Sequence, residues 1–516
     1  MKIIALLDSK VSRKWLIAIV FLFLLLFLFN LTILPIFCDE AIYIRWAQII
    51  KNEPTLRFIP LTDGKQPLFM WLNAITFSFF NNPLFAGRII SVIAGLINLF
   101  GTALLANRLF PEYKKSIFYL TAFLFMFSPF VFFFSRMALA DSLLSSLLTW
   151  SVLMALIYAD TNKIIFSLFS GVLLGLAWIT KSPAIFYAVL IPLVFAFIYL
   201  IKNTKRFKQL FLSRDMLIKL FGLSFIPIIA FAIFNFLRVD QSFHMIALRN
   251  KDYIFPISEI LKHPLNPLIP HLKDAWRYYY GYLTLPVAFL GIFGIIGSLI
   301  KKNARVNSLI LLLFWFTPLV AQSAVAKVFT ARYIFFTVPF FLIYCAFGLN
   351  FIFEELKLKI QARFIILMLV VILPLNFIRL LIFSPEKAPL PVDEKNGYLQ
   401  DWTAGQGIKQ IADYITDKSK ENKVIVSTEG YFGTLPDGLQ IYVEGNSNII
   451  VIGYTVPINE IPDALKNAKE AGDTTYLVVN KSRMEIKNKE DLELIEEFYK
   501  PGKDSLLFYE YNPSNE

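Results

Sequence analysis

The sequence has little of what most metal-dependent, redox and nucleotide-dependent proteins need. Its 516 residues include only two cysteines and three histidines. No Walker loop, no G-x-G-x-x-G after a strand, no C-x-x-C pair and no H-E-x-x-H motif occurs. We therefore expect no cofactor; a divalent metal is possible, but none of these motifs supports one. A synthetic reaction would need a substrate that already carries an activated bond.

Charged residues are also scarce, at 17%, whereas 57% of the residues are hydrophobic and the mean hydropathy is +0.60. About 20 apolar residues cross the hydrocarbon core of a bilayer. About eleven such runs precede residue 383, which predicts a polytopic α-helical membrane protein. Ser135, Arg136 and Asp141 interrupt one long apolar region. The runs cover residues 14–36, 85–106, 116–134, 138–159, 164–180, 183–201, 217–237, 283–300, 307–325, 331–352 and 364–382.

The formal net charge of +12 does not indicate a nucleic-acid partner, because Lys and Arg gather in alternate short loops. The positive-inside rule places such loops in the cytoplasm. The N-terminus is then predicted in the cytoplasm and everything after Phe383 outside a plasma membrane. The first run is longer than the roughly 7–15 residues of a signal peptide core, so it is interpreted as a retained anchor. The basic loops are Lys10–Lys14, Arg108–Lys115, Lys202–Arg214, Lys301–Arg305 and Lys357–Arg363.

The chain is predicted to have two parts. A membrane domain covers residues 1–382, with long outer loops at 37–80 and 238–282. A linker, 383–399, leads into a soluble extracytoplasmic α/β domain, 400–516. In that domain helices are predicted over GIKQIADYITDKSK, PDALKNAKEA and DLELIEEFYK, and strands over KVIVST, LQIYVEG, NIIVIGY, TTYLVVN and SLLFYEY.

Three acids are candidates for function. Asp39 and Glu40 directly follow the first apolar run, where carboxylates are either solvated by water and headgroups or part of a working site. Asp141 lies about a turn inside a later run, and its burial costs a few kcal/mol unless it is paired or faces a wet cavity. Arg136 is its candidate partner, so a structural salt bridge is the alternative to a functional acid.

Cationic groups are predicted at the same outer level. Lys65 stands between Gly64 and Pro67, which indicates a turn leading into a helix. It is either a solvated turn cation or a point-charge partner for lipid phosphate. Arg332–Tyr333 begins the tenth run, either as a snorkelling anchor with an interfacial aromatic or as part of a site. Acids and cations around one cavity suit a lipid-phosphate substrate, because cations neutralise a phosphate leaving group and a carboxylate accepts a proton.

The layout resembles the polyprenyl-phosphate-sugar-dependent membrane glycosyltransferases of glycosyltransferase family 39, the group of the protein O-mannosyltransferases and lipid A aminoarabinose transferases. The resemblance implies a C-type glycosyltransferase fold, with Asp39 as the catalytic base, Asp141 as a second catalytic carboxylate, and Lys65 and Arg332 contacting lipid phosphate. We expect Glu40, Arg136 and Tyr333 to bind substrate. The motifs that carry the resemblance are DE at 39–40, GKQPLFMWL at 64–72, AGRIISVIAGL at 86–96, SRMALADSLL at 135–144, GLAWITKSPA at 175–184 and RYIFFTVP at 332–339.

One position departs from that pattern. The aminoarabinose branch has a Glu directly before the loop Lys, implicated with a loop His in metal contact, whereas this chain has Gly64 there and Asp63 one step earlier. A metal site is therefore not expected, and the histidines at 244, 263 and 271 are interpreted as interfacial loop residues. The C-terminal domain does not resemble MIR repeats, so a protein acceptor is not implied.

The predicted function is an inverting glycosyltransferase. It would move a sugar from a polyprenyl-monophosphate donor to an acceptor hydroxyl on the outer face, the acceptor being a glycan, a lipid or a protein. The alternatives are a transporter or flippase of lipid-linked sugars, and a binding protein whose external domain works while the spans anchor it. Transporters place charges near the bilayer midplane and show paired repeats, neither of which is predicted here.

Overall fold

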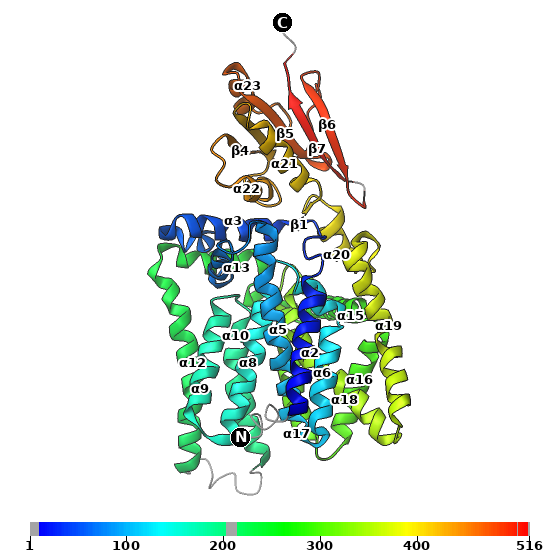
Figure 1. Cartoon of the computed structure of the whole chain (residues 1–516). Coiled ribbons are helices and arrows are strands. Elements are labelled where there is room, and N and C mark those ends of the chain that lie inside the picture. Colours follow the sequence, from blue (N-terminus) through cyan, green and yellow to red (C-terminus); the bar gives the residue numbers. More distant parts are fainter. Residues whose placement is uncertain (1–9, 203–213, 503, 514–516) are drawn as a thin grey trace. The chain divides into compact units, whose positions relative to one another are not determined.

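The computed structural model describes residues 10–202, 214–502 and 504–513, and it divides into two compact units (Figure 1). We call the first the helical unit; it comprises Met1–Phe29, Arg57–Phe69 and Ile89–Ile382. We call the second the mixed unit; it comprises Asn30–Leu56, Met70–Arg88 and Phe383–Glu516. The predicted domain boundaries, at residues 382 and 400, remain predictions.

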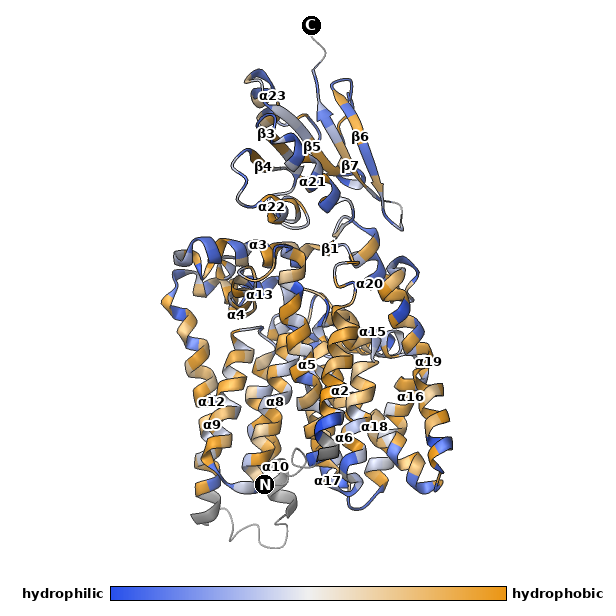
Figure 2. Ribbon diagram, in the orientation of Figure 1, coloured by the Kyte–Doolittle hydropathy of each residue, from blue (hydrophilic) through white to orange (hydrophobic). Residues whose placement is uncertain are grey.

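The helical unit contains a helix at each predicted apolar run, and these helices are apolar along most of their length (Figure 2). Among the described residues, six helices are long and apolar enough to cross a membrane, or seven if one bent pair is counted as a single span. The predicted number of about eleven spans therefore remains a prediction. The helices at these runs are α2 (Lys10–Leu28), α5 (Pro83–Leu109), α6 (Lys114–Met126), α7 (Pro129–Phe134), α8 (Ala140–Thr161), α9 (Ile164–Trp178), α10 (Ala184–Lys202), α12 (Arg214–Asn235), α16 (Leu285–Ile300), α17 (Arg305–Val325), α18 (Val338–Glu355) and α19 (Ile360–Phe383).

Two predicted spans are interrupted for local reasons. The run at 116–134 breaks into α6 and α7, because Pro129 begins a new helix and the Ser128 hydroxyl accepts a hydrogen bond from the Val131 amide. The run at 331–352 opens with two short 3₁₀ turns, Ala331–Tyr333 and Phe335–Thr337, before α18 begins.

The predicted outer loop 238–282 is mostly helical. It contains α13 (His244–Tyr253), α14 (Ile257–Lys262) and α15 (Leu268–Leu283). α15 meets α16 at a bend of 117°. The aromatic cluster of the loop belongs to α15, where Tyr278, Tyr279 and Tyr282 are buried.

Small residues let helices of this unit approach closely. A Cβ atom on Gly294 of α16 would lie 1.9 Å from the Tyr344 carbonyl oxygen of α18. No side chain fits there, so the two backbones pack directly against each other, as is typical of helices that associate in membranes.

The mixed unit is built on a five-stranded sheet in the order β4-β3-β5-β7-β6. β3 (Val424–Glu429) pairs in parallel with both β4 (Ile449–Tyr454) and β5 (Thr474–Asn480), while β7 (Ser505–Tyr511) pairs antiparallel with β5 and with β6 (Leu492–Tyr499). Ile458, Leu465, Leu477 and Val479 belong to its apolar core. Its helices include α21 (Ile408–Lys418), α22 (Asp437–Val443) and α23 (Asp463–Glu470).

Two of the predicted elements of this unit are wrong. LQIYVEG, predicted as a strand, lies mostly in helix α22, which begins directly after Pro436. DLELIEEFYK, predicted as a helix, forms strand β6, which pairs with β7. β6 carries a register shift between Leu494 and Glu496, so its apolar residues do not alternate strictly. The other helices and strands predicted in this domain are present.

The mixed unit also contains the segment that follows α2. β1 (Ile36–Phe37) pairs antiparallel with β2 (Ala404–Gly405), with Ile36 opposite Gly405. Helix α3 (Cys38–Asn52) then packs against α22: the Gln48 side chain donates to the Ile441 carbonyl over 2.9 Å, and Arg45 forms an ion pair with Glu444. This packing joins the two predicted acids, Asp39 and Glu40, to the same compact unit as the sheet.

Candidate functional site

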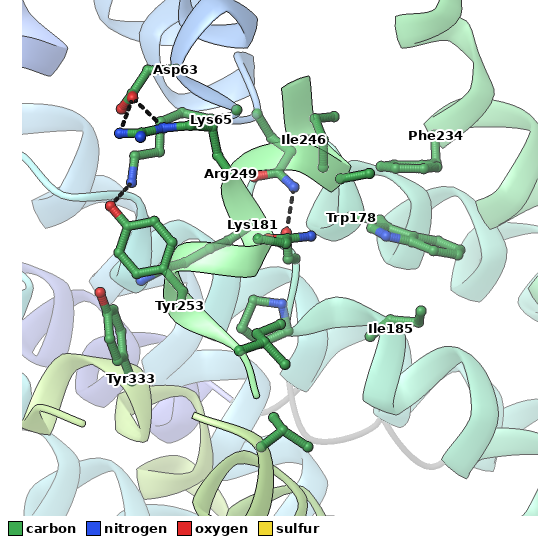
Figure 3. Close-up of a pocket in the computed structure, with 18 of the residues that line it drawn as sticks. Asp63, Lys65, Trp178, Lys181, Ile185, Phe234, Ile246, Arg249, Tyr253 and Tyr333 are labelled. Atoms are coloured by element: carbon green, nitrogen blue, oxygen red, sulfur yellow. Dashed lines mark hydrogen bonds and ion pairs between the residues drawn. The ribbon is translucent and has the colours of Figure 1, made fainter. Parts of the chain in front are cut away.

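A cavity of about 550 Å³ lies within the helical unit (Figure 3). Its residues come from the loop at 63–66, from the junction of α9 and α10, from α13 and from the segments around α17 and Tyr333. One part of the lining is polar and carries Lys65, Lys181 and Arg249. Another part is apolar and includes Trp178, Ile185, Phe234, Phe243, Ile246 and Val325. A concave site of this composition suits a ligand with an anionic head and an apolar body.

The loop with Lys65 has the predicted turn. Gly64 has a left-handed backbone at φ +70°, and a Cβ atom there would lie 2.7 Å from the Arg249 Cβ atom and 2.8 Å from the Met245 carbonyl oxygen. Only glycine fits this conformation and this close approach to α13. The turn leads into α4 (Leu68–Thr76), as the sequence predicted.

Lys65 is held against α13. Its Nζ atom donates to the Tyr253 hydroxyl over 3.3 Å and lies 4.6 Å from the centre of the Tyr253 ring (Figure 3). Both contacts hold the ammonium group beside α13. Gln66, the next residue, donates from its side chain to the Ser182 hydroxyl over 2.7 Å, which ties this loop to the start of α10.

Asp141 is buried, with 3% of its surface exposed, and forms an ion pair with Lys181. The Lys181 Nζ atom lies 2.6 Å from Asp141 Oδ1 and 4.8 Å from the centre of the Tyr333 ring. Asp141 therefore acts on the cavity through Lys181, which lines it. Arg136 was the candidate partner of Asp141 from the sequence; the ion pair of Asp141 is with Lys181 instead.

Arg136 has other contacts. Its guanidinium donates to the Phe29 carbonyl oxygen over 2.9 Å and lies 4.5 Å from the Phe132 ring centre. It is 1% exposed and does not line the cavity. The described contacts of Arg136 join the residue after α2 to α7.

Arg249 adds a third cation to the cavity. Its guanidinium lies 2.7 Å from Asp63 (Figure 3). It also lies 2.9 Å from Asp252. Asp63 raises the pKa of Arg249, so the group is charged at all physiological pH values. Because two carboxylates already face it, we assign less of the net positive charge of the cavity to Arg249 than to the two lysines.

Arg332 and Tyr333 are neighbours in the turn Ala331–Tyr333. Tyr333 lines the cavity, and the Arg332 guanidinium lies 5.2 Å from the centre of the Tyr333 ring. Within the helical unit the structure thus brings together Lys65 and Tyr333 at the cavity, Asp141 through Lys181, and Arg332 beside Tyr333.

Glu40 forms a buried ion pair with Arg88, and both side chains are fully buried. The two carboxylate oxygens accept from Arg88 Nε and Nη2, each over 2.8 Å, and one of them also accepts from the Phe37 amide over 3.0 Å. Arg88 further donates to the carbonyl oxygens of Leu31 and Leu34. Glu40 therefore fixes the start of α3.

Asp39 stands in the first turn of α3 and is half-buried. The preceding residue, Cys38, donates its amide to the Thr403 carbonyl oxygen over 3.0 Å. Burial, together with the charge of Asp39, raises the pKa of the Cys38 thiol to about 12. The thiol is therefore neutral at physiological pH. Both cysteines of the chain are free.

The loop residues do not fit a metal site of the kind known from the aminoarabinose branch. Position 64 excludes a side chain, and Asp63 is bound to Arg249. The three histidines lie apart: His244 Nδ1 bonds the Gln241 carbonyl, His271 Nδ1 bonds the Ser323 carbonyl, and His263 lies near Glu259. Among the described residues no group of three or more His, Cys, Asp or Glu side chains could hold a metal ion.

The comparisons with known proteins agree with this geometry. The family model described as dolichyl-phosphate-mannose-protein mannosyltransferase matches residues 64–235, which include Lys65, Arg88, Asp141 and Lys181. No curated protein sequence matches the chain. Two solved structures of ArnT from Cupriavidus metallidurans share its fold.

The ArnT structure in the apo state is 12% identical, covers 97% of this chain and 98% of its own, and gives a TM-score of 0.58. The structure bound to undecaprenyl phosphate is 12% identical, covers 96% and 98%, and gives 0.57. The chain has a C-type glycosyltransferase fold. The predicted resemblance is confirmed, and with it the predicted enzyme class: the matches support a glycosyltransferase over a flippase.

Lys181 and Arg88 are two of the site or positioning residues that could not be singled out from the sequence, and Arg249 is a third. Lys181 and Arg88 lie within motifs that carried the resemblance, GLAWITKSPA and AGRIISVIAGL. The available signal was a single cation at the end of an apolar run, which costs free energy near a membrane unless it has a partner.

Proposed function

We propose that this protein transfers a sugar, with inversion, from a polyprenyl-monophosphate donor to an acceptor hydroxyl on the extracytoplasmic face of the membrane. The observation that carries the proposal is one cavity lined both by Lys65 and Lys181 and by a group of apolar side chains. The two ammonium groups suit a phosphate, and the apolar side chains, Trp178 and Phe234 among them, suit an isoprenoid chain. The structure of ArnT with undecaprenyl phosphate adds support, because that protein shares the fold and binds this class of lipid.

The reaction needs a base, an attacking hydroxyl and a stabilised leaving group. Asp39 accepts the proton of the acceptor hydroxyl, and the oxygen attacks the anomeric carbon from the face opposite the phosphate. The bond between the anomeric carbon and the phosphate oxygen breaks, and the polyprenyl phosphate leaves with the bonding electrons. Lys65, Lys181 and Arg332 stabilise the charge that develops on it.

The other site residues have supporting roles in the proposal. Asp141 holds the Lys181 ammonium group, and Tyr333 gives it an aromatic face. Arg136 and Glu40, which the sequence analysis assigned to substrate binding, are positioning residues here, since their described contacts are with the protein. Two lysines supply the positive charge that a divalent ion provides in other enzymes, so we propose that transfer needs no cofactor and proceeds in the presence of EDTA.

The proposed orientation has the N-terminus in the cytoplasm and residues 400–516 outside. It rests on the alternate basic loops of the sequence and on the positive-inside rule. A phosphatase fused after residue 516 should be active outside the cytoplasmic membrane. A fused phosphatase that works only in the cytoplasm would contradict the orientation.

The Asp39→Asn variant tests the proposed reaction. Asparagine has nearly the same size but cannot accept a proton, so we expect transfer to fall by a factor of about 10²–10⁴. Product formation would be measured with the purified full chain in micelles, where a flippase has no second compartment and makes no product. Undecaprenyl phosphate binding should be unchanged. Transfer within a few fold of the wild type would contradict the role of Asp39.

A further inference from the structure

A short aromatic loop in the mixed unit lies outside the chemistry described so far. We define it as residues 430–433, Gly-Tyr-Phe-Gly, directly after β3. The glycines at its two ends have φ values of +74° and +120°, a backbone conformation that other residues rarely adopt. The rings between them are exposed: Tyr431 by 68% and Phe432 by 62%. Two adjacent exposed rings on a turn with glycine at both ends form an apolar patch, and such patches are typical of ligand-binding or interaction surfaces.

The aromatic loop is fixed in place next to the start of α3. The Gly433 amide donates to the buried Asp437 carboxylate over 2.6 Å, and Gly430 forms a β-bridge with Tyr454. A Cβ atom on Gly433 would lie 3.1 Å from the Cys38 sulfur. The loop is therefore in contact with the residue that precedes Asp39, within one compact unit.

Polar groups gather at the foot of the aromatic loop. Glu429, the last residue of β3, is 2% exposed and accepts two hydrogen bonds of 2.7 Å from the Asn480 amide and side chain. Arg483 lies 3.7 Å from Glu429, and its guanidinium stacks 3.4 Å from the centre of the Trp402 ring. Glu429, Asn480 and Arg483 stand at the carboxyl ends of β3 and β5, where open α/β sheets bind their ligands.

We propose that the aromatic loop, with Arg483 and Trp402, binds a sugar residue of a glycan acceptor next to Asp39. This inference rests on the proposed function and names its acceptor class. The C–H faces of a sugar ring are weakly positive and pack on the negative faces of aromatic rings, while its hydroxyl groups need charged and amide partners. The loop offers the aromatic rings, and Arg483, whose side chain is 21% exposed, offers a charged partner.

The main rival occupant is the membrane interface, where exposed aromatic side chains are also common. Anchoring two rings in lipid does not require the buried Glu429 carboxylate or the stacked Arg483 guanidinium beside them. The fixed polar network of Glu429, Asn480 and Arg483 therefore favours a polar ligand with an apolar face.

Saturation-transfer NMR on the full chain in lipid nanodiscs tests the inference. The probes are methyl α-mannoside and methyl N-acetyl-β-glucosaminide at millimolar concentration. We expect transfer to the ring C–H protons of at least one probe, and a loss of most of that signal in the double variant Tyr431→Ala, Phe432→Ala. The matched control is Tyr499→Ala, which removes an aromatic ring that is 77% exposed on β6, the opposite edge strand of the same sheet.

Two results would overturn the inference. The first is an NMR result: no saturation transfer to either probe in the wild type, or an equal signal in the double variant.

The second comes from thiol labelling and would show that the loop is buried in lipid. We expect a Phe432→Cys thiol in a Cys38→Ser background to react with a charged maleimide in nanodiscs, and to react more slowly when glycoside is present. A thiol that reacts only after detergent extraction would identify a membrane anchor instead.

The failure of this inference can be told apart from failure of the proposed function. Undecaprenyl phosphate binding, measured on the same preparations, depends on the cavity of the helical unit and should be equal in the wild type and the double variant. If the NMR saturation-transfer signal of the glycoside is lost while lipid binding is intact, only the inference about the aromatic loop fails. If the glycoside gives a saturation-transfer signal but the lipid does not bind, the aromatic loop remains a sugar site and the proposed polyprenyl-phosphate donor is contradicted.

Discussion

Two buried ion pairs in this protein have nearly the same chemistry and different surroundings. Glu40 and Arg88, in the mixed unit, are both fully buried, and Arg88 also donates to backbone carbonyl groups. Asp141 and Lys181, in the helical unit, differ in exposure: the Asp141 side chain is 4% exposed and that of Lys181 is 20% exposed, at the cavity. Burial and pairing alone therefore do not identify a working site. The feature that identifies the working site is the cavity that Lys181 lines.

Breaking the Glu40–Arg88 pair should have the largest effect on stability. Replacing Glu40 by Gln leaves a buried guanidinium without its counter-charge, which costs about 3–5 kcal/mol. Thermal unfolding of the purified chain would measure it. The matched control is Glu444→Gln on the partly exposed Arg45–Glu444 pair of the same unit, where about 1 kcal/mol or less is expected. Equal losses for the two variants would refute the difference between the pairs.

Breaking the Asp141–Lys181 pair should affect activity more than stability. In Asp141→Asn, Lys181 remains hydrated through the cavity but loses the group that positions it, so we expect a loss of about 10–100-fold in transfer. The unfolding temperature should change little. Steady-state kinetics with varied donor would measure the effect, and Asp141→Glu should restore part of the activity. A large drop in unfolding temperature with unchanged turnover per folded molecule would make this pair structural, like the first.

A smaller effect, on pH dependence, is expected at Asp437, which holds the aromatic loop. Burial raises its pKa from 3.8 to about 6. The folded state therefore binds more protons than the unfolded state between these values, and this contribution to stability is present below about pH 4 and lost as pH rises through 6. Its size is at most about 3 kcal/mol. Unfolding measured from pH 4 to 7 should show the Asp437→Asn variant gaining stability relative to the wild type; parallel curves would contradict the assignment.

Much of the helical unit could be predicted from the sequence, because a long apolar run in a membrane protein has few alternatives to a helix. The turn at Gly64–Lys65 was also predictable, since glycine before and proline after the lysine are strong local signals. The number of spans was harder, because Ser128 and Pro129 begin a new helix inside an apolar run.

Ion pairs between residues far apart in the sequence could not be predicted in the same way. Lys181 stands between two apolar runs and resembles an ordinary loop cation, and nothing local indicates that it meets Asp141, which is 40 positions away. Arg88, near the start of α5, meets Glu40 for reasons that only the fold provides. In the mixed unit, the acid-rich β6 was predicted as a helix because its register shift breaks the alternation that marks a strand.

The most direct test of the central claim is the affinity of the full chain for undecaprenyl phosphate in nanodiscs, without donor sugar or acceptor. If the cavity of the helical unit holds the lipid phosphate, Lys181→Ala and Lys65→Ala should each weaken binding by about 10-fold, the loss expected for one charged contact. Lys262→Ala, which removes an exposed lysine of α14, should bind as the wild type does. Wild-type affinity in both cavity variants would contradict the account.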